Sequence, residues 1–180
     1  MDILDEVSKD VARDFKDHKK QAKNVIKIFI CGSYQGSDKQ LLKDLRDKVR
    51  DKNGLDIPGT FLLEDIVPKE DMGLDKKFEL VWKKINKGDF IPLCILYAGE
   101  TTKESQGVNI EIANISKDFY KKRRTRIIRY DNIEAAHQIK EFPYHIITTI
   151  KEFEQTAKRL IMAEVETIIS CLIDKRKFGG

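Results

Sequence analysis

The stretch Ser105-Gln-Gly-Val-Asn-Ile-Glu-Ile-Ala-Asn114 follows an apolar run at residues 91–98, and this order decides the expected fold. The apolar run has the length and composition of a buried strand. The stretch after it predicts a helix that begins near Val108, which places Glu111 in the first turn of a helix at the carboxyl end of a strand. Ligands of open α/β sheets bind at that edge. Glu111 is therefore the first candidate functional residue.

A second strand-to-helix junction lies at residues 26–37, which read Ile-Lys-Ile-Phe-Ile-Cys-Gly-Ser-Tyr-Gln-Gly-Ser. The strand predicted at 26–31 breaks into glycines and hydroxyl side chains before the next helix. Backbone N–H groups at such a turn bind anions readily. The two junctions together predict a small nucleotide pocket with one carboxylate aimed into it.

Apolar runs of strand length alternate with helix-spaced patterns along the rest of the chain. The expected strands lie at 26–31, 60–66, 90–97, 126–130 and 144–149. The expected helices follow at 38–52, 75–86, 108–122, 132–140 and 150–175, with one more at 1–24. This alternation predicts an α/β three-layer sandwich of about five parallel strands with helices on both faces. A chain of 180 residues suits one domain, with an α/β core at 25–149 between the terminal helices.

Composition and charge limit the classes of partner. Charged residues make up 36% of the chain, yet 34 basic and 30 acidic side chains leave a net charge of only +4. This balance indicates a soluble surface rather than a strong nucleic-acid binder. The longest apolar run, 90–98, is far shorter than a membrane-spanning helix, and the amino terminus lacks a signal-peptide core. We expect a cytoplasmic protein that binds neither a membrane nor nucleic acid.

The cysteines and histidines give no sign of a metal centre or a disulfide framework. Cys31, Cys94 and Cys171 are odd in number and widely separated. The three histidines share no spacing with one another or with a cysteine. No metal and no cofactor are expected.

The terminal helices suggest a homodimer. Ile3, Val7, Val11 and Phe15 form a narrow apolar stripe, and the helix at 150–175 carries a broad apolar face from Phe153 to Leu172. Large exposed apolar faces are rare on monomers. The alternative is that the two helices pack on each other within one chain.

Several motifs together resemble the nucleoside 2-deoxyribosyltransferase superfamily. They are Ile30-Cys-Gly-Ser-Tyr-Gln-Gly36, the acidic end of the segment 60–66, Asp89 before the third strand, and Ser105-x-Gly-Val-x-x-Glu111. The nearest likeness is to the 2'-deoxynucleoside 5'-phosphate N-hydrolases, over about residues 26–130. Glycine-serine loops are common in proteins, and the order of these motifs is more specific than any one of them.

The resemblance implies a flavodoxin-like (Rossmann-like) fold, usually dimeric, that breaks the N-glycosidic bond of a nucleotide or nucleoside. The glutamate matching Glu111 attacks the anomeric carbon in that family. The residues matching the two junction loops would bind the substrate and its 5' end, and they are Gly32, Ser33, Tyr34, Gly36, Glu64, Asp65, Ser105 and Gly107. TIR-type NAD glycohydrolases use a comparable glutamate, which makes NAD another candidate substrate.

The residues support the same chemistry without the family. An anomeric carbon that loses a base gains oxocarbenium character, and a carboxylate can trap it. A second carboxyl must then protonate the departing base or activate water. The candidates are Asp75, Asp89, Glu64 and Asp65, of which Asp89 is preferred and Asp75 comes next. Asp89 has an alternative role as a residue that caps or turns the chain.

Each candidate also has a structural interpretation. Glu111 is suited to complement the helix dipole from a first turn, which is worth about 0.3–1 kcal/mol. Cys31 and Trp82 are typical core residues, and the basic run at 121–124 is typical of a solvated helix end. A non-catalytic nucleotide-binding or sensing module is the alternative to the enzyme, since such a module needs the glycine loop but not the carboxylate.

Overall fold

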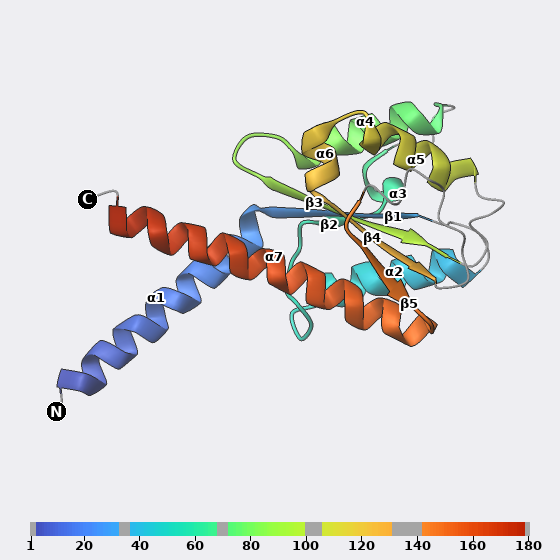
Figure 1. Ribbon diagram of the computed structural model, residues 1–180. Helices are drawn as coiled ribbons and strands as arrows, with labels where there is room; N and C mark the ends of the chain where they lie inside the picture. The colour runs from blue at the N-terminus through green and yellow to red at the C-terminus, as the bar shows by residue number, and fades with distance from the viewer. Residues whose placement is uncertain (1–2, 33–36, 68–71, 100–105, 131–141, 179–180) are drawn as a thin grey trace.

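The computed structural model describes residues 3–32, 37–67, 72–99, 106–130 and 142–178. Its five strands form one parallel sheet in the order β2-β1-β3-β4-β5 (Figure 1). The strands are β1 (Ile26–Gly32), β2 (Thr60–Phe61), β3 (Ile91–Ala98), β4 (Thr125–Tyr130) and β5 (Tyr144–Ile147). This strand order is that of flavodoxin-like folds. The predicted α/β fold with a parallel sheet is confirmed.

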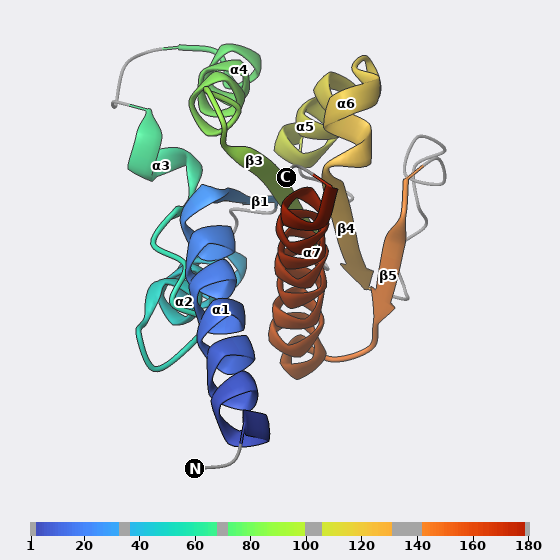
Figure 2. The same ribbon diagram turned by 90° about the vertical axis from the view of Figure 1, so that its left-hand side faces the viewer.

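Helices cover both faces of the sheet. They are α1 (Ile3–Val25), α2 (Ser37–Arg50), α3 (Leu63–Ile66), α4 (Leu74–Ile85), α5 (Gln106–Ser116), α6 (Phe119–Arg123) and α7 (Ile150–Phe178). Figure 2 shows α1, α2 and α7 on one side of the sheet and α4, α5 and α6 on the other. Each set encloses its own apolar core against the strands.

The central strands β1 and β3 pair in register from Ile26 with Ile91 to Gly32 with Tyr97. Their side chains alternate between the two cores, so that Ile30 faces α2 and α7 whereas Phe29 faces α4 and α5. Strands covered on both faces need apolar residues at consecutive positions. This requirement explains the continuous apolar runs seen in the sequence.

The second strand is shorter than the predicted 60–66, because the chain turns into α3 after Phe61. The Asp65 carboxylate accepts a hydrogen bond from the Leu62 backbone N–H at 2.9 Å and closes a helical turn. Arg46 and Arg50 of α2 hold the same carboxylate at 2.8 and 3.1 Å. These side-chain contacts favour the turn over the strand.

The helix predicted at 108–122 is two helices, α5 and α6, divided at residues 117–118. Asp118 caps the second one, since its side chain accepts a hydrogen bond from the Tyr120 N–H at 2.8 Å. The expected fifth strand, 144–149, ends at Ile147, and the next residue, Thr148, donates its backbone N–H to the Glu152 carboxylate in the first turn of α7. The helix predicted at 132–140 lies outside the described residues.

The packing of the terminal helices removes one of the two reasons for expecting a dimer. The broad face of α7 is buried within the chain, with Phe153, Ile161 and Val165 all at 0% exposure. The helices α1 and α7 also lie against each other. Val11 and Phe15 of α1 remain 64% and 51% exposed. The expectation of a dimer therefore rests on the α1 stripe alone.

None of the helices within the described ranges is both long enough and apolar enough to cross a membrane.

The position of Ile161 gives a test of the α7 packing. Ile161→Glu places a charge in the core between α7 and the sheet, so it should lower the free energy of unfolding by at least about 3 kcal/mol or prevent folding. Phe15→Ser is the control, and it should change that free energy by less than about 0.5 kcal/mol in a monomer. Urea unfolding followed by circular dichroism measures both. A stably folded Ile161→Glu monomer would contradict the packing described here.

Candidate active site

Glu111 lies in the second turn of α5, and its carboxyl group faces the central strands. The side chain is 2% exposed and lies among the apolar residues that α4 and α5 press against the sheet. Cys31 of β1 donates a hydrogen bond to it, and Cys94 of β3 lies 3.5 Å from Cys31, sulfur to sulfur. Among the residues that the structure describes, Glu111 Oε2 has no hydrogen-bond partner.

This location coincides with the switch point of the sheet. In the order β2-β1-β3-β4-β5, the chain leaves β1 for α2 on one face and leaves β3 for α5 on the other. Folds with this strand order bind their ligands outside the carboxyl ends of β1 and β3. Glu111 comes from the helix that follows β3 and touches the last part of β1. The prediction that it lies at the carboxyl edge of the sheet is confirmed.

Burial changes the ionisation of Glu111. Removal from water raises the pKa of the carboxyl to about 8, and the Cys31 hydrogen bond opposes that rise. Burial likewise raises the pKa of the Cys31 thiol well above its usual value. At neutral pH most molecules therefore hold a neutral carboxylic acid beside the neutral thiol of Cys31. A buried carboxyl whose pKa is raised this far is typical of functional sites.

The dipole interpretation of Glu111 is wrong. The helix α5 begins at Gln106 rather than near Val108, and its first turn contains no acidic residue. The helix-dipole effect falls off within the first turn. A buried, mostly neutral carboxyl in the second turn does little to stabilise α5. Its presence there has no structural explanation among the described contacts.

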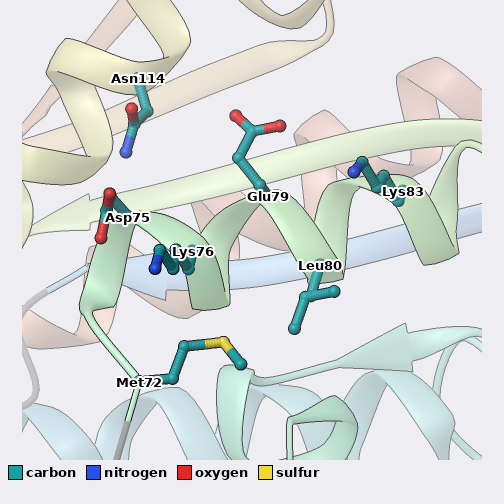
Figure 3. A pocket seen from close by; sticks show the side chains of 7 residues that line it. All are labelled: Met72, Asp75, Lys76, Glu79, Leu80, Lys83 and Asn114. Carbon is teal, nitrogen blue, oxygen red and sulfur yellow. The ribbon is translucent and has the colours of Figure 1, made fainter.

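A cleft of about 320 Å³ lies between α4 and α5, one helical turn along from Glu111. Asn114 enters it from α5, and Glu111 and Asn114 are three residues apart, so they share one flank of that helix. Figure 3 shows Asp75 on the opposite wall, with the Asn114 amide pointing toward it. Within the described part of the chain, Asn114 Nδ2 is buried without a hydrogen-bond partner.

Asp75 is the predicted second carboxyl that lies on the same side of the sheet as Glu111, and it lines the cleft that Asn114 enters. It lies in the first turn of α4, at the carboxyl edge of the sheet. A β-carbon at Gly73 would lie 2.7 Å from Asp75 Oδ1. The carboxylate therefore folds back over the glycine that precedes α4. Gly73 leaves room for this conformation.

The prediction that Asp89 works with Glu111 is wrong. Asp89 precedes β3 at the amino edge, where it lines a different cavity with Ile91 and Arg124. In the register of the sheet, Cys31 of β1 pairs with Leu96 of β3. Five residues of β3 separate Leu96 from Ile91, or roughly 17 Å, and Asp89 lies beyond Ile91 in the turn before the strand. The alternative role for Asp89, at the turn before the strand, fits this position.

Glu64 and Asp65 are ion-pair residues rather than groups directed into a pocket. Glu64 lies 3.4 and 3.1 Å from the ammonium groups of Lys39 and Lys43. Asp65 is held by two arginines of α2, as described above. All these contacts join α2 to α3 and explain both acids without a ligand.

The predicted glycine loop is described only at its start. Gly32 has a φ of +134°, and a β-carbon there would lie 2.0 Å from the Tyr97 carbonyl oxygen. This residue must be glycine for β1 and β3 to remain in register. Gly107 is the second residue of α5. Ser33, Tyr34, Gly36 and Ser105 lie outside the described residues.

Sequence reasoning missed three side chains at this edge. Asp38 of α2 is 8% exposed, and a β-carbon at Gly99 would come within 2.3 Å of its Oδ2 atom. Cys94 and Asn114 carried no signal beyond burial and helix spacing, because their neighbours in space are far away in sequence.

Within the described ranges, no group of His, Cys, Asp and Glu side chains is arranged to hold a metal ion. No model of a known protein family matches the sequence, and no curated protein matches it either.

The raised pKa of Glu111 makes stability depend on pH. The folded state keeps a proton to about pH 8, whereas the unfolded chain loses it near 4.5. The contribution of Glu111 to stability should therefore be greatest below about pH 4.5, fall through the interval, and level off above about pH 8. The loss is on the order of 5 kcal/mol, since each pH unit contributes about 1.4 kcal/mol.

Glu111→Gln removes this titration and keeps the shape of the side chain. The variant should gain stability over the wild type between pH 5 and pH 8, as measured by urea unfolding at a series of pH values. Glu166→Gln on the exposed side of α7 is the control and should follow the wild-type curve. Parallel curves for wild type and Glu111→Gln would show that Glu111 titrates normally.

The two thiols give a matched pair of variants for the same carboxyl. Cys31→Ala removes the hydrogen bond that favours the ionised form, so it should raise the pKa of Glu111 further. Cys94→Ala removes a sulfur of equal size that touches Cys31, and it should shift that pKa less. Carbon-13 NMR of the glutamate carboxyls, assigned with Glu111→Gln, measures both values. If the pKa of Glu111 is the same in Cys31→Ala and Cys94→Ala, the Cys31 thiol does not favour the ionised carboxylate.

Proposed function

We propose that this protein is an enzyme that cleaves the N-glycosidic bond of a nucleotide or nucleoside, with Glu111 as its nucleophile. The observation that carries the proposal is the carboxyl group buried at the switch point, with one oxygen that lacks a partner among the described residues. Above neutral pH, a buried carboxyl of this kind adds nothing to the stability of the folded protein. Its cost is explained if the group reacts with a ligand at this edge.

The neutral form of Glu111 is a resting state in this proposal. The ionised carboxylate attacks the anomeric carbon, the C–N bond breaks, and the bonding electrons leave with the base. Positive charge develops on the sugar as the bond breaks, and a carboxylate in a site of low dielectric stabilises it strongly. The reaction itself therefore favours the anion that burial disfavours in the free enzyme.

Asp75 is the proposed acid and base. It would donate a proton to the departing base and then take one from the water that hydrolyses the glycosyl ester of Glu111, which restores both carboxyls. The cleft between α4 and α5 supports this role, because Asp75 and Asn114 face each other there (Figure 3). If a second nucleobase replaces the water, the same intermediate gives transfer instead of hydrolysis.

The resemblance to nucleoside deoxyribosyltransferases supports this class of substrate, and the related TIR-type enzymes add NAD. The alternative is a nucleotide-binding module without turnover. It would use the loops at the carboxyl edge but would not need the Glu111 carboxylate.

Release of free base from a panel of substrates tests the proposal. The panel contains nucleosides, deoxynucleoside monophosphates and NAD, and chromatography detects the base. Glu111→Gln should lower turnover at least about a hundredfold and leave binding of the same compound, measured by calorimetry, within about threefold. Binding without base release by the wild type would favour the non-catalytic module.

The dependence on pH and two further variants sharpen this test. Below about pH 8, kcat/KM should rise up to about tenfold per pH unit as Glu111 ionises. Asp75→Asn should lower kcat, whereas Asp89→Asn should leave it unchanged, because Asp89 lies at the other edge of the sheet. Loss of activity in Asp89→Asn alone would reverse the assignment of the second carboxyl.

A further inference from the structure

A second recess lies at the amino edge of the sheet, far from Glu111. It is a groove of about 820 Å³ bounded by α6, the start of β4 and the middle of α7. Figure 2 looks onto this edge and shows α6 and α7 on opposite sides of β4. We call it the α6–α7 groove. Its functional chemistry is separate from that of the candidate active site.

Basic side chains dominate the α6–α7 groove. Lys122, Arg123, Arg124 and Arg126 line it, and Glu164 is the acidic residue among its described lining. Glu164 is 8% exposed and is shared by two of them, at 2.5 Å from Arg124 and 3.5 Å from Arg126. One carboxylate therefore faces two guanidinium groups. The part of the groove where Arg124 and Arg126 pair with Glu164 therefore keeps a net positive charge.

The backbone fixes these two guanidinium groups in position. Arg124 Nε donates to the Pro92 carbonyl at 2.9 Å, and Arg126 Nη1 donates to the Arg123 carbonyl at 2.7 Å. A cation held in this way loses little further entropy when an anion binds beside it. The charge of Arg124 and Arg126 is thus preorganised rather than carried by freely moving side chains.

Aromatic rings lie beside these cations. Phe119 is 74% exposed and Tyr120 is 45% exposed, although burial of aromatic rings is favourable. The guanidinium of Arg123 lies 5.7 Å from the centre of the Phe119 ring. An exposed ring next to a fixed positive charge offers both a stacking surface and a phosphate contact. Proteins bind single-stranded nucleic acid with this combination.

We propose that the α6–α7 groove binds single-stranded nucleic acid, with bases stacked on Phe119 and phosphates held by Arg123 and its basic neighbours. An acidic peptide would use the cations but would leave the exposed ring unused. The small net charge of the whole chain does not oppose this proposal, because a net charge averages over the surface whereas the groove gathers basic residues in one place. The proposal is independent of the N-glycosidase activity.

Fluorescence anisotropy with labelled oligothymidylate and oligouridylate of 12 nucleotides tests it. Phe119→Ala should weaken binding at least about fivefold through lost stacking. Arg123→Ala should weaken binding and reduce the slope of log K against log salt by about 0.7, the value for one phosphate contact on a single strand. Both side chains are exposed, so the melting temperature should not change.

Controls separate stacking from charge alone. Phe15→Ala and Lys151→Ala remove an exposed ring and an exposed charge elsewhere and should leave affinity unchanged. An abasic oligonucleotide should bind more weakly than the normal one and should not respond to Phe119→Ala. Failure of the wild type to bind either oligonucleotide, or equal binding by Phe119→Ala, overturns the proposal. Binding to phosphatidylserine vesicles but not to oligonucleotides would also overturn it and assign the groove to membranes.

Discussion

The rest of the molecule depends on the pairing of β1 with β3, two strands that are buried on both faces. The pairing runs over the whole length of β1 and requires apolar side chains at consecutive positions. Because the strands are parallel, each return to the sheet needs a crossover, and the helices of these crossovers cover the two faces. The chain leaves the two strands on opposite faces, which opens the edge at their carboxyl ends. Gly32 permits the close approach of the two backbones at that end.

The same constraint makes Glu111 unusual. Each face of β1 and β3 is an apolar surface, and a carboxyl set against it loses its hydration. Thiols are the polar groups that β1 and β3 offer it, and a thiol is a weak hydrogen-bond donor. The carboxyl therefore stays neutral until something else stabilises its charge. A group with this property is costly for the fold, and the proposed reaction would use it, because that chemistry creates positive charge nearby.

The two edges of the sheet differ in their chemistry. Acids gather at the carboxyl edge, where Asp38, Asp75 and Glu111 lie on three different helices. Arginines gather at the amino edge, where α6 and β4 meet α7. A basic surface at the far edge does not pair with the acids, since the length of the strands separates them. One small domain can therefore present two surfaces of opposite character.

The order of strands and helices followed from the sequence, because period and length distinguish buried strands from amphipathic helices. Glu111 at the carboxyl edge followed from the same pattern. The short β2, the break between α5 and α6, and the burial of the α7 face did not, because they depend on the side-chain contacts of Asp65, Asp118 and Ile161. Tertiary structure also decided which acids lie at the same edge of the sheet. Asp75 and Asp89 look alike in sequence, each beside the end of an element, but the direction of the parallel strands sends them to opposite edges. The neutral state of Glu111 likewise required the fold, since desolvation depends on residues that are distant along the chain.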